Sequence, residues 1–347
     1  MSEDQLKEIA ENQKRKEEKV LFITLVLIFC TIVGFFVSLL VGSNSYPPET
    51  MIDTILGKGT WGSYFVLHNL RIPRSLCVIA VGAGLSIAGV AMQSLFKNPM
   101  ASPSILGLSS GASFGASLSI AFGIGAIFGS LSTPIMAFVF CMITMLLVYG
   151  LSVTRYGTPV TLLLLSGVAV GAFFSGMTSF IQYVVEPDIL QGVVYWTLGS
   201  FSRSSWTSVY YGIPTIIIGI IMIAMCHKEL NLISLGEEQA KTLGINIRRT
   251  RILLLIGTSL CVGGAVAIAG VIGFVGLIIP HVCRAMVGPN HSILIIVSIF
   301  TGAIFMLIMD CICRYLGEIP VGVLTSLLGA PFFIYIMRKK KSEFWGA

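Results

Sequence analysis

The sequence predicts an all-α, polytopic membrane protein with about ten transmembrane helices. The first observation is composition: 55% of the 347 residues are hydrophobic and only 11% are charged, whereas a soluble domain carries charge on about a quarter of its residues. The second is that apolar runs of about 20 residues, the length that spans a bilayer, follow one another with short gaps. Lipid is therefore the solvent that fits this chain.

The chain begins with a charged stretch, residues 1–19, which we expect to be a solvated cytoplasmic extension whose composition is compatible with a helix. The apolar run at 20–41 is too long for the core of a signal peptide and has no small-residue cleavage site after it, so we expect it to be retained as the first span. The remaining predicted spans are 75–95, 104–124, 132–152, 160–184, 207–226, 251–270, 272–283, 292–312 and 321–337. These runs define a transmembrane domain at 20–337, and residues 338–347 form a basic tail. The short eighth run is the weakest prediction of a full crossing.

Positively charged residues predict the orientation, because loops rich in Lys and Arg stay in the cytoplasm. Ten crossings place both termini there. The predicted cytoplasmic side then holds Lys14–Lys19, Lys97, Arg155, Lys228, Lys241, Arg248, Arg249, Arg251, Arg284 and Arg338–Lys341. The opposite side holds Lys58, Arg71, Arg74, Arg203 and Arg314, which are conspicuous there because they are few.

Small residues recur at four-residue spacing, as in Gly82/Ser86 and Ala265/Ala269. Such spacing allows helices to approach closely in lipid. The pattern VGAG…IAGV at 81–90 also returns as VGGA…IAGV at 262–271. The two segments are predicted to cross in opposite directions, as in an inverted repeat; chance similarity between two Gly/Ala-rich helices explains the match equally well.

The sequence lacks the motifs of several enzyme classes. It has no phosphate-binding loop, since Gly57 and Lys58 are followed by glycine, and no H-E-x-x-H or G-x-S-x-G motif. The eight cysteines form no C-x-x-C pair and are interpreted as packing residues. His68 and His281 are single and are interpreted as structural. We therefore expect no catalytic residue, no metal site and no cofactor bound by this chain, and no nucleic-acid partner.

Asp310 is the one acidic residue that lies inside a predicted span. An ion-coupled secondary transporter would be expected to carry such groups near mid-membrane. Asp310, however, lies near the outer end of its helix and four residues before Arg314, which puts both side chains on one helix face as a pair. The energy for transport is therefore expected to come from another subunit, with an ion-coupled transporter or channel as the alternative.

Two groups of motifs carry a family resemblance. The first comprises RIPR at 71–74, GAGLSIAGVAMQ at 82–93, NPMASP at 98–103 and LG at 106–107. The second comprises LGEEQAKTLG at 235–244, GVIGFVGLIIPH at 270–281 with Arg284, EIPVG at 318–322 and LGAP at 328–331. In this order they resemble the two halves of the permeases of iron-chelate, haem and cobalamin ABC importers, so the resemblance covers nearly everything after the first helix.

This resemblance implies a type II ABC importer permease in the cytoplasmic membrane of a prokaryote. It implies a second permease copy or close paralogue, two ABC ATPase subunits that bind ATP and Mg, and an extracytoplasmic substrate-binding protein. The cargo implied is an iron chelate, with ferric siderophore first and haem, cobalamin or molybdate-type oxyanions as relatives. Import by alternating access would be driven by the separate ATPase subunits.

The resemblance also assigns roles to residues. Arg71, Arg74 and Arg314 match arginines that receive acidic residues of the binding protein; the alternative is snorkelling of arginines to lipid headgroups. The polar segment 228–250 matches the coupling helix that contacts the ATPase, with an ordinary surface connector as the alternative; its motif residues are Leu235, Gly236, Glu237, Glu238, Ala240, Leu243 and Gly244. By analogy the fifth span lines the path, with Thr158 and Thr161 at an inner gate and Ser166, Ser175 and Thr178 along the path. Polar residues of this kind also serve as interhelical contacts.

Overall fold

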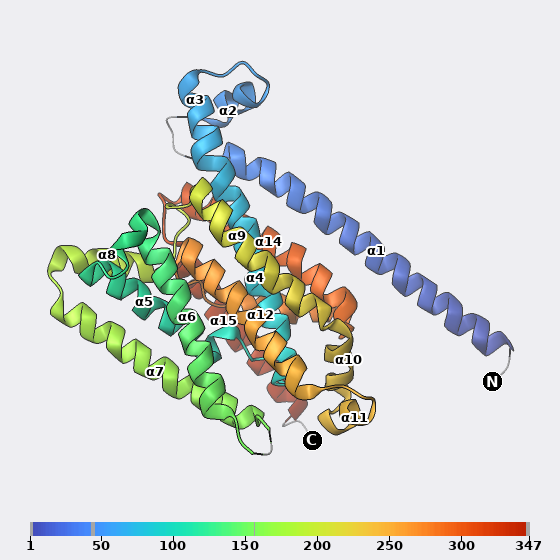
Figure 1. Cartoon of the computed structure of the whole chain (residues 1–347). Coiled ribbons are helices and arrows are strands. Elements are labelled where there is room, and N and C mark those ends of the chain that lie inside the picture. Colours follow the sequence, from blue (N-terminus) through green and yellow to red (C-terminus); the bar gives the residue numbers. More distant parts are fainter. Residues whose placement is uncertain (1–2, 43–45, 156, 345–347) are drawn as a thin grey trace.

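The computed structural model describes residues 3–42, 46–155 and 157–344, and within these ranges the chain is almost entirely helical (Figure 1). The helices are α1 (Glu3–Leu40), α2 (Pro48–Ile55), α3 (Trp61–Val66), α4 (Ile72–Leu95), α5 (Leu108–Phe122), α6 (Ser132–Ser152), α7 (Val160–Val184), α8 (Pro187–Thr197), α9 (Trp206–Met225), α10 (His227–Leu235), α11 (Glu237–Thr242), α12 (Ile247–Ala269), α13 (Val275–Val287), α14 (His291–Tyr315) and α15 (Val321–Phe344). A π-helical turn, Leu67–Arg71, joins α3 to α4 without a break.

Each of the ten predicted apolar runs contains an α-helix. In the described part of the chain, seven helices are long and apolar enough to cross a membrane, and three shorter apolar helices are Leu108–Phe122, Val275–Val287 and Val321–Tyr335. The predicted bounds 132–152 and 160–184 coincide with those of α6 and α7. The predicted fold class, an all-α polytopic membrane protein, is confirmed.

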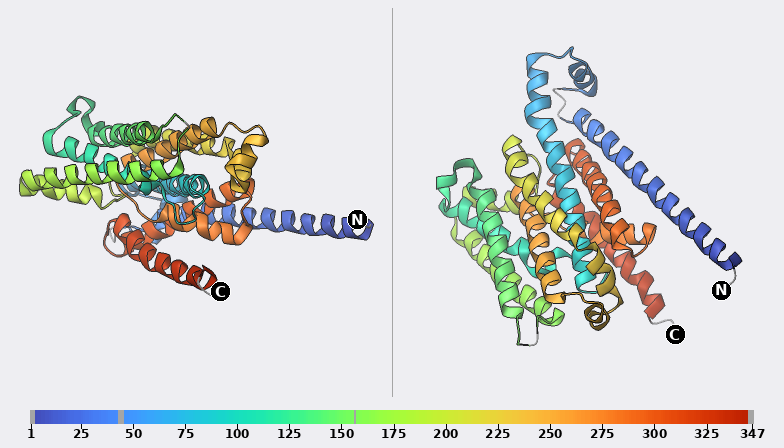
Figure 2. Two further views of the ribbon diagram at one scale, coloured as in Figure 1. Left: turned by 90° about the horizontal axis from the view of Figure 1, so that it is seen from below. Right: turned by 45° about the vertical axis from the view of Figure 1, so that its right-hand side comes forward.

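Helix α4 forms the centre of the bundle and packs against α9, α12, α13 and α14 (Figures 1 and 2). The neighbouring helices can approach α4 closely because small residues lie at the contacts. A Cβ atom added to Gly82 would overlap the carbonyl group of Gly302 in α14, and one added to Gly89 would overlap the carbonyl group of Gly276 in α13. The predicted close packing through small residues is confirmed for α4.

Helices α4 and α12 lie side by side and run in opposite directions, as the predicted order of spans requires. Gly84 of α4 packs near Cys261 of α12. The inverted repeat itself stays a prediction.

Several boundaries differ from the predicted ones. Helix α1 is continuous from Glu3 through the predicted extension, because no proline or glycine interrupts residues 3–33. The predicted span 104–124 was wrong at its start: Pro103–Leu106 is a 3₁₀ turn, and Gly107, at φ 70°, begins a new helix. Helix α15 continues past residue 337, so the predicted boundary between the last span and the tail at 338 does not coincide with the end of a helix. The short helices α2, α3 and α8 were not predicted.

The two ends of the bundle carry different elements (Figure 1). Helices α2 and α3 stand at one end, which we call the outer end. Helices α10 and α11, the start of α1 and the end of α15 lie at the opposite, inner end. Helix α1 touches the bundle near its outer end, mainly at α14, and diverges from the bundle toward its start (Figure 2).

Candidate functional site

The three predicted docking arginines lie together at the outer end. With Asp310 and Glu318 they form what we call the outer arginine cluster, and the three arginines and Glu318 border a cavity of about 220 Å³. Helix α4 and its π-helical turn supply Arg71 and Arg74, while α14 supplies Asp310 and Arg314. Segments more than 200 residues apart in the sequence therefore meet here.

Arg71 and Arg314 are turned inward to the end of α1. Arg71 is 5% exposed, and its two terminal nitrogens donate hydrogen bonds to the carbonyl oxygens of Leu39, Leu40 and Tyr46 at 2.7–3.0 Å. Arg314 is 7% exposed and donates to the carbonyl oxygens of Ser38 and Val41 and to the Ser38 hydroxyl. The last carbonyls of a helix have no intrahelical partner and favour positive charge. These two guanidinium groups therefore cap α1 and hold it to the bundle.

Arg74 differs from the other two because both of its contacts are carboxylates. Its Nη2 lies 2.9 Å from Oδ1 of Asp310, and its Nη1 lies 3.0 Å from both oxygens of Glu318. Asp310 also pairs with Arg314 at 2.9 Å, so the predicted pair of Asp310 and Arg314 is present. The Asp310 side chain is 1% exposed, whereas that of Glu318 is 50% exposed. Among the three arginines, Arg74 is thus the one whose partner faces solvent.

Sequence reasoning missed Glu318 as a member of this cluster and Ser38 as a hydrogen-bond partner of Arg314. Glu318 stands in the EIPVG motif with φ 66°, a left-handed backbone that follows Gly317 at φ 89°. This turn brings the carboxylate back over α4. The motif was visible in the sequence, but the direction of the turn was not.

The predicted coupling segment forms two short helices at the inner end, α10 and α11, separated by Gly236. Gly236 has φ 145° and Gly244 has φ 86°, backbone angles that favour glycine. Ala240 is fully buried in a small apolar cluster with Ile233 and Ile247. In contrast, Leu235 and Leu243 are 66% and 60% exposed. One face of the segment is therefore packed, and the other presents two leucines to solvent.

The two acidic residues of the segment have different surroundings. The hydrogen bond from Lys241, at 2.8 Å, holds the pKa of the exposed Glu238 carboxyl below its usual value. Glu237 instead lies 2.6 Å from Nη2 of Arg251 in α12. Arg251 is 6% exposed and its Nη1 donates to the carbonyl oxygen of Thr158, just before α7. Arg251 thus joins the coupling segment to the inner end of α7, a connection that sequence reasoning missed.

The predicted path residues do not share one face of α7. Thr158 and Thr178 are buried, and the Thr178 hydroxyl donates to the carbonyl of Phe174 in its own helix. Ser166 is half-buried, Thr161 and Ser175 are exposed, and Ser175 donates to the hydroxyl of Ser110 in α5 at 3.1 Å. The exposed face of α7 is mainly apolar, with Leu165, Val168, Phe173, Phe180 and Tyr183.

The two histidines singled out in the sequence lie at opposite ends. The carbonyl of His68 accepts a hydrogen bond from the Trp206 indole at 2.8 Å. His281 lines a cavity of about 480 Å³ at the inner end, together with Lys97 and Arg284. Within the residues that the structure describes, no group of three or more His, Cys, Asp or Glu side chains is arranged to hold a metal ion.

Comparison with known proteins gives consistent matches. The sequence profile of the FecCD transport family matches residues 30–339. The permease of the cobalamin import system of Halobacterium salinarum is 39% identical over 277 residues, 80% of this chain and 74% of that protein. The permease of the iron(3+)-hydroxamate import system of Bacillus subtilis is 35% identical over 335 residues, 94% of this chain and 99% of that protein.

A solved structure, described as an inward-facing conformation of a metal-chelate type ABC transporter, has the same fold. Its TM-score with this chain is 0.80 at 32% identity, covering 92% of this chain and 99% of that chain. Together with the helical bundle and the matching motifs, these similarities show that the chain is a multi-pass membrane permease of the ABC importer type and belongs to the FecCD transport family.

Proposed function

We propose that this chain carries a metal chelate, a ferric siderophore in the first place and haem or cobalamin as alternatives, inward across the cytoplasmic membrane of a prokaryote by alternating access. The observation that carries the proposal is the family match over residues 30–339, together with a relative named for iron(3+)-hydroxamate import that covers 94% of the chain. Ion coupling through Asp310 has no support, because Arg74 and Arg314 both pair with that carboxylate.

In this proposal the outer end faces the extracytoplasmic binding protein. Arg74 is the docking group, and Glu318 occupies its outward side until an acidic residue of the partner takes its place. The half-exposed position of Glu318 supports this role, since an exposed ion pair is weak and exchangeable. Arg71 and Arg314 contribute positive potential, and their hydrogen bonds keep α1 in place.

The inner end receives two ABC ATPase subunits, which bind ATP and Mg. Leu235 and Leu243 support this assignment, because two exposed leucines on a polar segment form an apolar contact that a partner can cover. Movement of α11 passes through Glu237 and Arg251 to Thr158, where α7 begins. Both chain termini then lie in the cytoplasm.

A second permease copy or a close paralogue covers the exposed apolar face of α7. Phe173, Phe180 and Tyr183 are 61%, 61% and 86% exposed there. Two such faces would enclose the path between the subunits, with Thr161 and Ser175 on the exposed side of α7 and Ser166 at its edge.

The cargo is tested by reconstituting the chain with its ATPase and binding protein in proteoliposomes. We expect ATP-dependent uptake of a radiolabelled ferric hydroxamate. Unlabelled cobalamin and haemin should inhibit this uptake only weakly. Stronger uptake of cobalamin or haem would replace the siderophore as cargo, and uptake of none of the three would contradict the proposal.

A further inference from the structure

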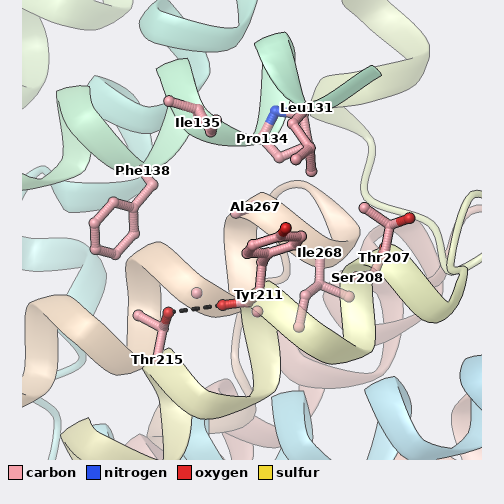
Figure 3. A pocket seen from close by; sticks show the side chains of 12 residues that line it. Leu131, Pro134, Ile135, Phe138, Thr207, Ser208, Tyr211, Thr215, Ala267 and Ile268 are labelled. Atoms are coloured by element: carbon pink, nitrogen blue, oxygen red, sulfur yellow. Dashed lines mark hydrogen bonds between the residues drawn. The ribbon is translucent and has the colours of Figure 1, made fainter. Parts of the chain in front are cut away.

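A groove near the outer end lies between α6 and α9, with α12 behind it (Figure 3). It consists of two cavities, of about 240 and 300 Å³, that share Leu131, Pro134, Thr207, Ser208, Ala267 and Ile268 in their walls. The two cavities therefore lie next to each other in one groove. The first cavity is almost entirely apolar, and the second extends to Arg203.

The apolar part is shaped by close helix packing. Gly212 of α9 and Gly264 of α12 allow the two helices to approach, and a Cβ on Gly212 would lie 2.5 Å from Cγ1 of Ile268. Figure 3 shows Phe138 and Ile135 of α6 across from Tyr211, whose side chain is among those lining the space. The Thr215 hydroxyl donates to the carbonyl of Tyr211 at 2.9 Å, so it is satisfied within its own helix. A ligand in this part must therefore be apolar.

The polar part contains an arginine without a partner. Arg203 makes no hydrogen bond or ion pair with any residue that the structure describes, unlike the three arginines of the outer cluster. Arg203 is exposed to solvent; partial desolvation lowers its pKa and no carboxylate offsets this shift, but arginine stays charged in proteins. The surrounding polar groups are hydroxyls, those of Ser130, Thr133, Ser205, Thr207 and Ser208, and neither cavity is lined by Asp or Glu. This end of the groove is suited to an anion.

Aromatic residues beside the groove indicate where it lies relative to the membrane surface. Trp206, Tyr210 and Tyr211 stand at the start of α9, and such aromatic residues gather where a membrane meets water. Arg203 precedes them in the chain, and the apolar cavity extends from Thr207 to Thr215 along the same part of α9.

We propose that this groove binds an anionic glycerophospholipid of the outer leaflet, with its phosphate at Arg203 and part of one acyl chain in the apolar cavity between α6 and α9. A soluble partner's carboxylate could match Arg203 alone but would leave the apolar cavity open. A phospholipid matches both parts, because its charge and its chain are joined in the order in which the groove presents them.

The test uses the full chain purified in detergent and titrated with phosphatidylglycerol while bound lipid is counted by native mass spectrometry. Arg203→Gln should weaken phosphatidylglycerol binding about fivefold, the equivalent of the ~1 kcal/mol that one basic residue contributes at an anionic surface. Lys58→Gln is the matched control: it removes another exposed positive charge on the outer side, away from the groove, and should leave binding unchanged.

A second arm tests the apolar part. Ala267→Phe places a ring in the groove and should displace phosphatidylglycerol while Arg203 is intact. Phosphatidylcholine, which has the same chains and phosphate without net charge, should bind more weakly to the unmodified chain. Equal binding of both lipids, or binding by Arg203→Gln equal to that by Lys58→Gln, would overturn the proposal.

Discussion

At the outer end, three arginines with the same predicted role make different contacts. Arg71 and Arg314 bind backbone carbonyls at the end of α1, while Arg74 binds two carboxylates. Removal of a buried guanidinium that caps a helix lowers stability, because the carbonyls that it leaves behind lose their hydrogen-bond donors. Substitutions in the cluster should therefore separate structural from docking effects.

Arg71→Met should loosen α1. It removes three hydrogen bonds from a charged donor and should lower the free energy of unfolding by ~1–3 kcal/mol. Thermal unfolding in detergent measures the loss, and Lys58→Met is the control for removal of an outer positive charge. An unchanged melting temperature would mean that α1 is held by its apolar contacts alone.

Arg74→Glu should weaken binding-protein-stimulated ATP hydrolysis of the assembled complex about tenfold or more, as a loss of ~1.4 kcal/mol or more in docking. Glu318→Gln should have the opposite effect, because the carboxylate that competes for Arg74 loses its charge. Steady-state ATPase assays over a range of binding-protein concentrations distinguish the two variants. The docking role is refuted if both variants match the unmodified protein.

The sequence allowed part of this cluster to be predicted. Asp310 and Arg314 are four residues apart on one helix, so their pairing follows from helical geometry. Arg74 meets Asp310 across 236 positions of the chain, and this contact depends on how α4 packs against α14. Local spacing carries no information on such a pair.

At the scale of elements, the predicted coupling segment combines a packed side with an exposed one. Leu235→Asp and Leu243→Asp should each reduce copurification of the ATPase, because a charge in an apolar contact must lose its water on binding. Leu56→Asp provides the control, since Leu56 at the end of α2 is 65% exposed but lies at the outer end. Affinity copurification should fall at least about tenfold for the first two variants. Equal recovery for all three would exclude this segment as the ATPase contact.

Arg251→Gln should uncouple ATP hydrolysis from transport. The variant keeps the leucines but breaks the link from Glu237 to Thr158. The ATPase should still copurify, and the number of substrate molecules transported per ATP should fall. Arg248→Gln, an exposed neighbour on α12, controls for loss of charge; a ratio unchanged in both variants would contradict the link.

Helix boundaries were predicted correctly where a residue that breaks helices marks the end of an apolar run. Pro159 precedes α7, and the bounds of α7 match the prediction. Helix α5 begins later than predicted because Gly107 takes a left-handed conformation within an apolar run, and hydropathy does not register backbone angles. Helices α2, α3 and α8 fell outside the apolar runs and left no signal of that kind.

At the scale of the whole molecule, ten apolar runs define a membrane protein but are compatible with any transporter. The family motifs separate the two ends: RIPR and EIPVG lie at the outer end, and LGEEQAKTLG lies at the inner end. Between them runs the span Trp61–Leu95, and 83% of its most apolar 18-residue stretch is buried. In the proposed function the outer end docks the binding protein and the inner end contacts the ATPase, so the energy for transport comes from partner subunits.

The central claim is that transport by this chain depends on a separate ATPase. The most direct measurement compares siderophore uptake in proteoliposomes that contain this chain with and without the ATPase, binding protein and ATP, under an imposed proton or sodium gradient. We predict uptake and ATP hydrolysis only when all partners and ATP are present, and no response to either gradient. Uptake that follows an ion gradient in the absence of the ATPase, or ATP hydrolysis by the purified chain alone, would contradict the account.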